Sequence, residues 1–109
     1  MGSPGGTGFG YELRGEDGHT VVSVHGELDM AGAPELAACL HHLCASGVMH
    51  VTVDLAGLRF CDSSGLETFL QCRTEAERQG AGLELRSPQP IVRRLFELTN
   101  TDELLSDRA

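Results

Sequence analysis

The feature that most constrains the fold of this chain is a central stretch, residues 51–70, where one hydrophobic period replaces another. Strand-like alternation comes first, at Val51, Val53 and Leu55. Apolar residues at helical spacing follow, at Leu66, Phe69 and Leu70. We predict a strand, a loop over residues 56–61, and then a helix that begins near Ser64.

The junction Asp62-Ser63-Ser64-Gly65 is rich in residues that cap helix N-termini, and Ser64 with Glu67 fits a capping box. The simplest interpretation is that these residues cap the helix and do nothing more. One helix needs one N-cap, however, and three consecutive candidates precede Gly65, which we expect to be flexible. At least one hydroxyl is therefore left over at the positive end of a helix, where backbone N–H groups favour an oxyanion.

The length and the net charge of the chain indicate a single domain and exclude some classes of binding partner. A chain of 109 residues suits one domain, which we place at residues 11–106, between a Gly-rich tail at 1–10 and a short tail at 107–109. The formal net charge is −8 and the chain contains no lysine, so we expect no nucleic-acid or membrane-surface binding. Without an apolar run of about 20 residues or a signal peptide, the expected location is the cytoplasm.

The order of the predicted elements is β-β-α-β-α-β-α-α, which is typical of an α/β domain. Strands are predicted at 11–14, 20–25, 51–55 and 82–86, and helices at 34–46, 64–79, from Pro90 and near 101–105. We expect the first strand to be antiparallel to the second and the others to be parallel, joined by right-handed crossovers. The helix after Pro90 is predicted to turn Ile91, Leu95 and Leu98 inward.

Functional sites of parallel sheets gather at the carboxyl ends of the strands. Two loops leave those ends here, residues 26–33 and 59–65. We therefore expect Asp29 and the Ser63-Ser64 pair to share one rim of the molecule.

The sequence motifs give little support to the hypotheses of an enzyme or of a metal-binding protein. A nucleophile elbow needs G-x-S-x-G, and neither Ser63 nor Ser64 has a glycine two places before it; no phosphate-binding loop motif occurs. His41 and His42 are adjacent, so on a helix they point about 100° apart and cannot share an ion. The four cysteines form no C-x-x-C pair and are predicted to be buried free thiols: Cys39, Cys44, Cys61 and Cys72. We expect no enzyme activity, metal or cofactor.

A phosphoacceptor serine suits the junction better. A phosphate adds about −1.5 to −2 charges, which a helix N-terminus tolerates, so the fold should survive modification. At about 6 Å from a partner carboxylate, with an effective dielectric of about 20, those charges repel by roughly 4 to 5 kcal/mol. That is about a thousandfold in affinity.

Three segments resemble the STAS-domain anti-sigma factor antagonists of bacteria, and the resemblance runs from about Tyr11 to Leu105. They are Gly26-Glu27-Leu28-Asp29, Asp54-Leu55 with Phe60-x-Asp62-Ser63-Ser64-Gly65-Leu66, and Val92 to Leu98. The resemblance implies a mixed sheet of four to five strands packed with about four helices, and no catalysis. In that family the unmodified domain binds an anti-sigma factor that is also a Ser/Thr kinase, which frees the sigma factor. The kinase then phosphorylates the antagonist, and a PP2C-type phosphatase resets it.

The resemblance assigns roles to individual residues. Ser63 matches the phosphorylated serine, and Asp29 matches the acidic loop residue beside the docking face. The residues implied in partner binding are Asp29, Asp62, Ser63, Ser64, Gly65 and Glu67. Glu67 stands where many relatives have a small residue, and Thr99-Asn100-Thr101 replaces a glycine-containing turn. The expected state is a monomer or weak dimer. An alternative is a constitutive STAS interaction subunit of a transporter, a lipid-transport complex or a stress-signalling assembly.

Overall fold

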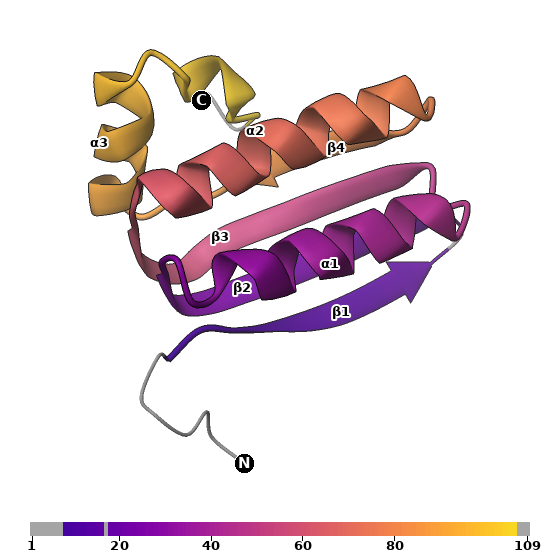
Figure 1. Ribbon diagram of the computed structural model, residues 1–109, viewed down its shortest axis with the longest axis horizontal. Coiled ribbons are helices and arrows are strands. Elements are labelled where there is room, and N and C mark those ends of the chain that lie inside the picture. Colours follow the sequence, from indigo (N-terminus) through magenta and orange to yellow (C-terminus); the bar gives the residue numbers. More distant parts are fainter. Residues whose placement is uncertain (1–7, 17, 107–109) are drawn as a thin grey trace.

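The computed structural model describes residues 8–16 and 18–106, coloured along the chain in Figure 1. The elements in chain order are β1 (Gly10–Glu16), β2 (His19–Leu28), α1 (Ala33–Ala45), β3 (His50–Cys61), α2 (Ser63–Arg78), β4 (Gly82–Arg86), α3 (Pro90–Leu98) and the 3₁₀ turn η2 (Asp102–Leu104).

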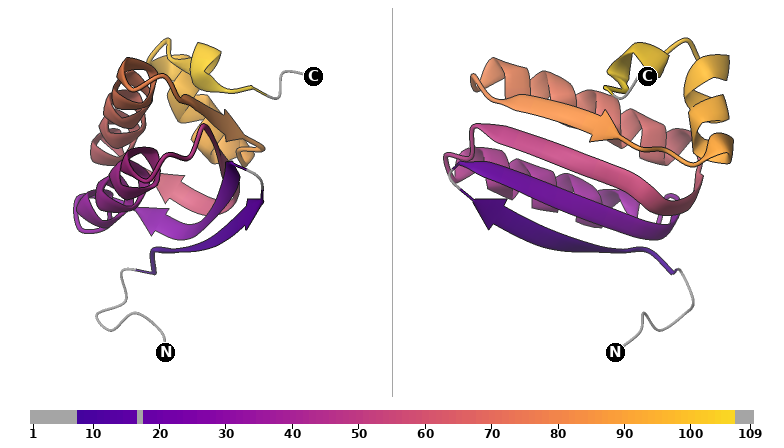
Figure 2. Two further views of the ribbon diagram at one scale, coloured as in Figure 1. Left: turned by 90° about the vertical axis from the view of Figure 1, so that its right-hand side faces the viewer. Right: turned by 180° about the vertical axis from the view of Figure 1, so that it is seen from behind.

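The four strands form one sheet in the order β1-β2-β3-β4. β1 is antiparallel to β2, and β2, β3 and β4 are parallel, which confirms the predicted mixed sheet. α1 and α2 lie side by side on one face of this sheet, and α3 lies at the end where β3 leads into α2 (Figures 1 and 2). The described residues contain three α-helices, whereas about four were expected, because the last predicted helix is a 3₁₀ turn.

Apolar side chains from one face of the sheet and one face of each helix fill the space between the two layers. Val22 and Val24 of β2 are buried, whereas His25 points to the other face of the sheet and is exposed, as predicted. The predicted stripe of α1 is also buried against the sheet, at Leu36, Leu40 and Leu43. The helices and the sheet therefore form two layers around a buried apolar core.

The predicted loop over residues 56–61 is wrong, because β3 continues to Cys61. β2 runs on to Leu28 and supplies the pairing partner for this second half of β3. Register shifts in the β2–β3 pairing break the two-residue alternation, and the next buried positions after Leu55 are Leu58 and Cys61. A sequence pattern with period two could not reveal this extension.

The predicted inner face of α3 is wrong for Ile91 and Leu98 and right for Leu95, which is partly buried and packs against the core. Val92 and Phe96 are buried, whereas Ile91 and Leu98 are 59% and 68% exposed. The Phe96 ring lies 6.3 Å from the ring of Phe69 on α2, so packing of Phe96 and Val92 favours this rotation of the helix. Helix α3 ends before Asn100, whose φ of 59° is left-handed, a conformation that glycine or asparagine commonly adopts after a helix.

The N-terminal boundary lies earlier than the sequence indicated. Phe9, which we assigned to the tail, is buried in the core, and β1 begins at Gly10. The remaining tail residues, 1–7 and 107–109, lie outside the described residues.

Candidate functional site at the start of helix α2

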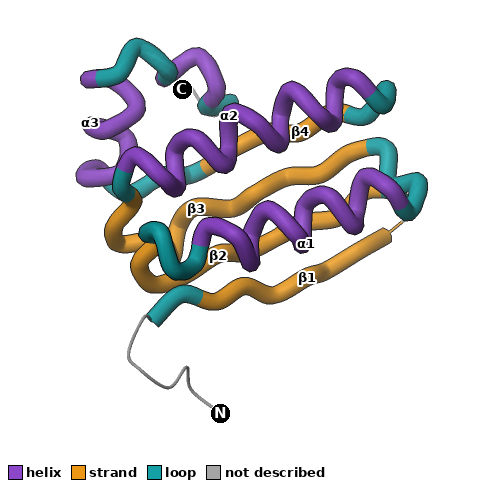
Figure 3. The backbone as a smooth tube through the Cα atoms, viewed as in Figure 1, coloured by secondary structure: helices purple, strands orange, loops and turns teal. Residues whose placement is uncertain are grey.

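The ends of two neighbouring parallel strands bring the predicted site residues together. Leu28 at the end of β2 pairs with Cys61 at the end of β3, and the Asp62 N–H donates to the Leu28 carbonyl at 3.2 Å. The β2–α1 loop, which starts at Asp29, and the β3–α2 junction therefore leave the sheet at the same end (Figure 3). Asp29 and Ser63 share one rim of the molecule.

Asp62 is the N-cap of α2. Its backbone is extended (φ −102°, ψ −172°), and its Oδ1 accepts a hydrogen bond from the Gly65 N–H at 3.1 Å. The predicted capping box of Ser64 and Glu67 is therefore wrong. Both serines lie within the first turn of the helix, where their hydroxyls are not needed as caps.

Ser63 is the first residue of α2 and its side chain is exposed, whereas Ser64 is half-buried. The first N–H groups of a helix have no partner within it and carry a partial positive charge. A hydroxyl in this position is open to an enzyme that transfers a phosphoryl group, and a resulting phosphate would meet a favourable helix end.

Gly65 is buried and serves close packing, so the expected flexibility is wrong. A Cβ atom at this position would lie 2.8 Å from Cys61 Sγ and 2.8 Å from Leu28 Cδ2. The absence of a side chain lets the first turn of α2 rest directly on the ends of β2 and β3. Gly65 thereby sets the height of Ser63 above the sheet, and any effect of Gly65 on a partner is indirect.

The Asp29 loop is held by its own carboxylate. Asp29 Oδ1 accepts from the Ala31 N–H at 3.0 Å and from the Gly32 N–H at 3.4 Å, and the Asp29 carbonyl accepts from the Ala33 N–H at 2.9 Å. These bonds form a compact turn that leads into α1. Met30 at its tip is 72% exposed.

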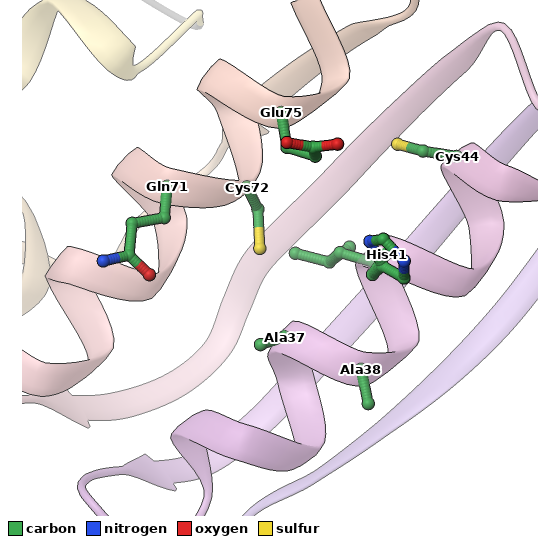
Figure 4. A pocket seen from close by; sticks show the side chains of 8 residues that line it. Ala37, Ala38, His41, Cys44, Gln71, Cys72 and Glu75 are labelled. Carbon is green, nitrogen blue, oxygen red and sulfur yellow. The ribbon is translucent and has the colours of Figure 1, made fainter. Parts of the chain in front are cut away.

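A hollow of about 350 Å³ lies between the first turns of α1 and α2. Its lining includes two of the predicted partner-binding residues, Ser64 and Glu67, together with Met30, Ala33, Pro34, Ala37, Thr68 and Gln71. Ala37 and Gln71 also line a larger groove of about 540 Å³ farther along the same helices, where Cys44 and Cys72 project between them (Figure 4). The interhelical surface is thus hollowed from the rim towards the far end of α1.

The thiols along this layer are held in the protonated form. Burial, together with the Asp62 carboxylate, raises the pKa of Cys61 to about 12. Burial, with smaller contributions from Cys44, Cys39 and Glu75, raises the pKa of Cys72 to about 11. All four cysteines are free; three are buried, as predicted, and Cys72 is half-buried. Protonated thiols are poor nucleophiles and poor metal ligands.

The rim carries both acidic side chains and exposed apolar side chains. Asp29, Asp62 and Glu67 supply negative charge beside the ion pair of Arg59 with Glu27 at 2.7 Å, and two exposed apolar side chains that were not predicted from the sequence, Met30 and Phe60, flank the junction. Their signal was present in the sequence, because Met30 directly follows Asp29 and Phe60 lies three residues before Ser63.

Within residues 8–16 and 18–106, no group of three or more His, Cys, Asp or Glu residues could hold a metal ion. No helix in the described part of the chain is long and apolar enough to cross a membrane.

The fold and the strand-to-helix junction define a STAS domain, and the sequence agrees. A family model described as "Mlab, STAS domain" matches residues 12–106, so the chain belongs to the STAS-domain family.

Two staphylococcal relatives are named anti-sigma-B factor antagonists. The chain is 31% identical over 84 residues to the anti-sigma-B factor antagonist of Staphylococcus epidermidis, covering 77% of this chain and 78% of the relative. It is 29% identical over 94 residues to the protein of that name from Staphylococcus aureus, covering 86% and 87%.

Solved structures share the fold. An anti-sigma factor antagonist from Mycobacterium paratuberculosis superposes with a TM-score of 0.81 at 27% identity, covering 96% of this chain and 87% of that one. The unphosphorylated form of the anti-sigma factor antagonist SpoIIAA superposes with a TM-score of 0.80 at 24% identity, covering 92% and 89%. The Bacillus SpoIIAA in its phosphorylated form gives 0.72 at 22% identity, covering 92% of each chain.

Proposed function

We propose that this chain is an anti-sigma factor antagonist whose binding is switched off by phosphorylation of Ser63. In the unmodified state it binds an anti-sigma factor that is also a Ser/Thr kinase, and a sigma factor is released. The kinase then phosphorylates Ser63, and a PP2C-type phosphatase reverses the modification. The observation that carries the proposal is the exposed Ser63 hydroxyl at the first position of α2, on the rim that also holds Asp29.

The names of the relatives support this proposal. The two staphylococcal proteins are anti-sigma-B factor antagonists, and the relatives cover most of this chain. The fold relative SpoIIAA has been determined both unphosphorylated and phosphorylated, so this fold accommodates the modification.

The local structure supports a phosphate that leaves the fold intact. Asp62 already caps the helix through the Gly65 N–H, so modification of Ser63 breaks no hydrogen bond of the cap. The helix dipole offsets part of the added charge. Glu67, one turn along α2, and Asp62 add repulsion of only a few tenths of a kcal/mol each, as like charges do on exposed helix surfaces.

The phosphate repels a docked partner much more strongly than it repels the neighbouring carboxylates of its own chain. Met30 and Phe60 give the rim an apolar surface on which a partner can exclude water around Ser63. The roughly 4 to 5 kcal/mol of repulsion between a phosphate and a partner carboxylate then separates the two proteins without any conformational change. Binding, and not catalysis, is the role of the site.

The test compares wild type, Ser63→Ala and Ser63→Asp in capture from the native cytosol, followed by titration of the purified partner. Ser63→Ala should bind but accept no phosphate from ATP, and Ser63→Asp should bind many-fold more weakly while melting at a similar temperature. Thr74→Asp is the matched control, because it adds the same charge to the exposed side of α2 about 16 Å from Ser63. Equal binding of Ser63→Asp and wild type would refute the switch, and a phosphate mapped to another residue would exclude Ser63.

A second candidate is a constitutive STAS interaction subunit, for instance in a transporter, a lipid-transport complex or a stress-signalling assembly. The description of the matching family model, which names Mlab and no sigma factor, favours it. A captured partner that has no kinase activity and binds Ser63→Asp as well as wild type would select this function.

A further inference from the structure

The hollow beside Ser63 has two walls of different chemistry. Met30 and Ala37 belong to its apolar wall, which the β2–α1 loop and α1 supply, whereas Ser64, Glu67 and Gln71 face it from α2. Its volume of about 350 Å³ is enough for one long side chain and too small for a helix. A side chain that suits both walls has an apolar stem and a polar end.

The polar wall favours a cation. The Glu67 carboxylate makes no hydrogen bond or ion pair with any residue in the described part of the chain. The Thr68 hydroxyl is already engaged, because it donates to the Ser64 carbonyl at 3.0 Å. With a chain charge of −8 and Asp29 and Asp62 on the same rim, an anionic side chain would be repelled here.

Arginine fits this wall better than lysine. A carboxylate oxygen of Glu67, the amide oxygen of Gln71 and the hydroxyl of Ser64 are acceptors spread along one face of α2. The planar guanidinium carries five N–H donors and can pair with a carboxylate through two of them. Its methylene stem would cover Met30 and Ala37, as long cationic side chains do on apolar surfaces.

We propose that this hollow receives an arginine side chain of the partner protein, with Glu67 as its carboxylate ligand, so that Glu67 determines partner specificity. The inference rests on the proposed function, since it names the chemistry of the partner at the same rim. Ser63 itself does not line the hollow, because neighbouring residues of a helix point about 100° apart. The arginine contact and the phosphorylation switch are therefore separate and can be separated by mutation.

The first experiment uses small probes and needs no partner. N-acetyl-arginine amide, added to isotope-labelled protein, should shift the backbone amide signals of Met30, Ser64 and Glu67 and saturate at millimolar concentrations. N-acetyl-citrulline amide, which has nearly the same shape without the charge, and N-acetyl-norleucine amide, which keeps only an apolar stem, should bind at least about tenfold more weakly. Equal binding of either neutral probe, or no saturable shift with the arginine probe, would overturn the proposal.

Glu67→Gln should remove the difference between the charged and neutral probes, because it keeps the size of the side chain and removes its charge. Glu84→Gln is the matched control, since Glu84 is exposed on β4 and does not line the hollow. If Glu67→Gln binds the arginine probe as wild type does, the carboxylate is not its ligand and the proposal fails.

The second experiment titrates the captured partner with Ser63→Asp, Glu67→Gln and Glu84→Gln. We expect Glu67→Gln to weaken binding about tenfold and to reduce its salt dependence, and Glu84→Gln to bind like wild type. If Ser63→Asp weakens binding and Glu67→Gln does not, the proposed function stands and the arginine contact is refuted. If only Glu67→Gln weakens binding, the arginine contact stands and the phosphorylation switch is refuted.

Discussion

Substitution of Gly65 by alanine tests how the first turn of α2 is held on the sheet. The added Cβ would lie 2.8 Å from Cys61 Sγ and 2.8 Å from two carbons of Leu28. Because contacts between carbon atoms are favourable only at about 3.5 to 4.0 Å, the helix or these side chains must move by about 0.7 to 1.2 Å. Overpacking of this kind costs about 1 to 3 kcal/mol, and the gain in helix propensity returns up to about 1 kcal/mol.

We therefore expect Gly65→Ala to lower the free energy of unfolding by about 1 to 2 kcal/mol and the Tm by about 5 to 15 °C. Urea titration should show a lower midpoint at an unchanged slope, because the folded surface stays similar. The displaced first turn should also slow phosphorylation of Ser63 by the kinase.

Gly82→Ala is the control, because its Cβ would meet only His50 Nδ1 at 3.5 Å, an ordinary contact. It should change stability by no more than about 0.5 kcal/mol. In a Cys61→Ala background the cost of Gly65→Ala should shrink, because one of the close contacts is gone. A Gly65→Ala protein as stable as wild type would refute the argument that the backbone must approach the sheet this closely.

Two further predictions concern the rotation of α3 and the thiols. Phe96→Ala should lower the free energy of unfolding by about 3 to 5 kcal/mol, whereas exposed Ile91→Ser should lower it by no more than about 0.5 kcal/mol. Chemical denaturation that shows the reverse order would support the helix face predicted from the sequence. Because burial favours the protonated thiol, alkylation of Cys72 in the folded protein should rise with a midpoint near pH 11, above the value of about 8.5 for a free thiol. The unfolded chain releases this proton earlier, so the free energy of unfolding should fall as the pH rises from about 9 towards 11. A midpoint near 8.5 in the folded protein would contradict the assigned burial.

The parts of the fold that could be predicted depend on local signals. The junction at Asp62 was visible because hydrophobic period and capping residues change together within a few positions. The parallel arrangement followed from the alternation of strands and helices. The extension of β3 to Cys61 could not be predicted, because it depends on pairing with the distant second half of β2.

Two other errors arose where the sequence offers more than one solution. Helix α3 carries apolar residues on adjacent faces, and the tertiary packing that buries Val92 and Phe96, including the contact of Phe96 with Phe69, selects the buried face. At the start of α2, three residues could cap the helix, and only the backbone geometry selects Asp62. Gly65 resembled a flexible residue because its close contact with Leu28 comes from another strand.

The position of the candidate site was largely predictable from the sequence, whereas the side chains that surround it were only partly predictable. The shared rim of Asp29 and Ser63 followed from the topological rule for parallel sheets. Met30 and Phe60 lie near Asp29 and Ser63 in the sequence, but they were missed because only the folded surface shows that these apolar side chains are exposed. The hollow that includes Ser64 and Glu67 depends on the spacing between α1 and α2, which no local pattern encodes.

The most direct test of the account measures partner affinity and thermal stability on the same two samples, the chain before and after phosphorylation of Ser63. We predict a dissociation constant about a thousandfold larger for the phosphorylated chain, with a Tm within a few degrees of the unmodified chain. Unchanged affinity would contradict the account. So would a loss of affinity that accompanies unfolding, because the charge would then act by disrupting the domain and not by repelling the partner.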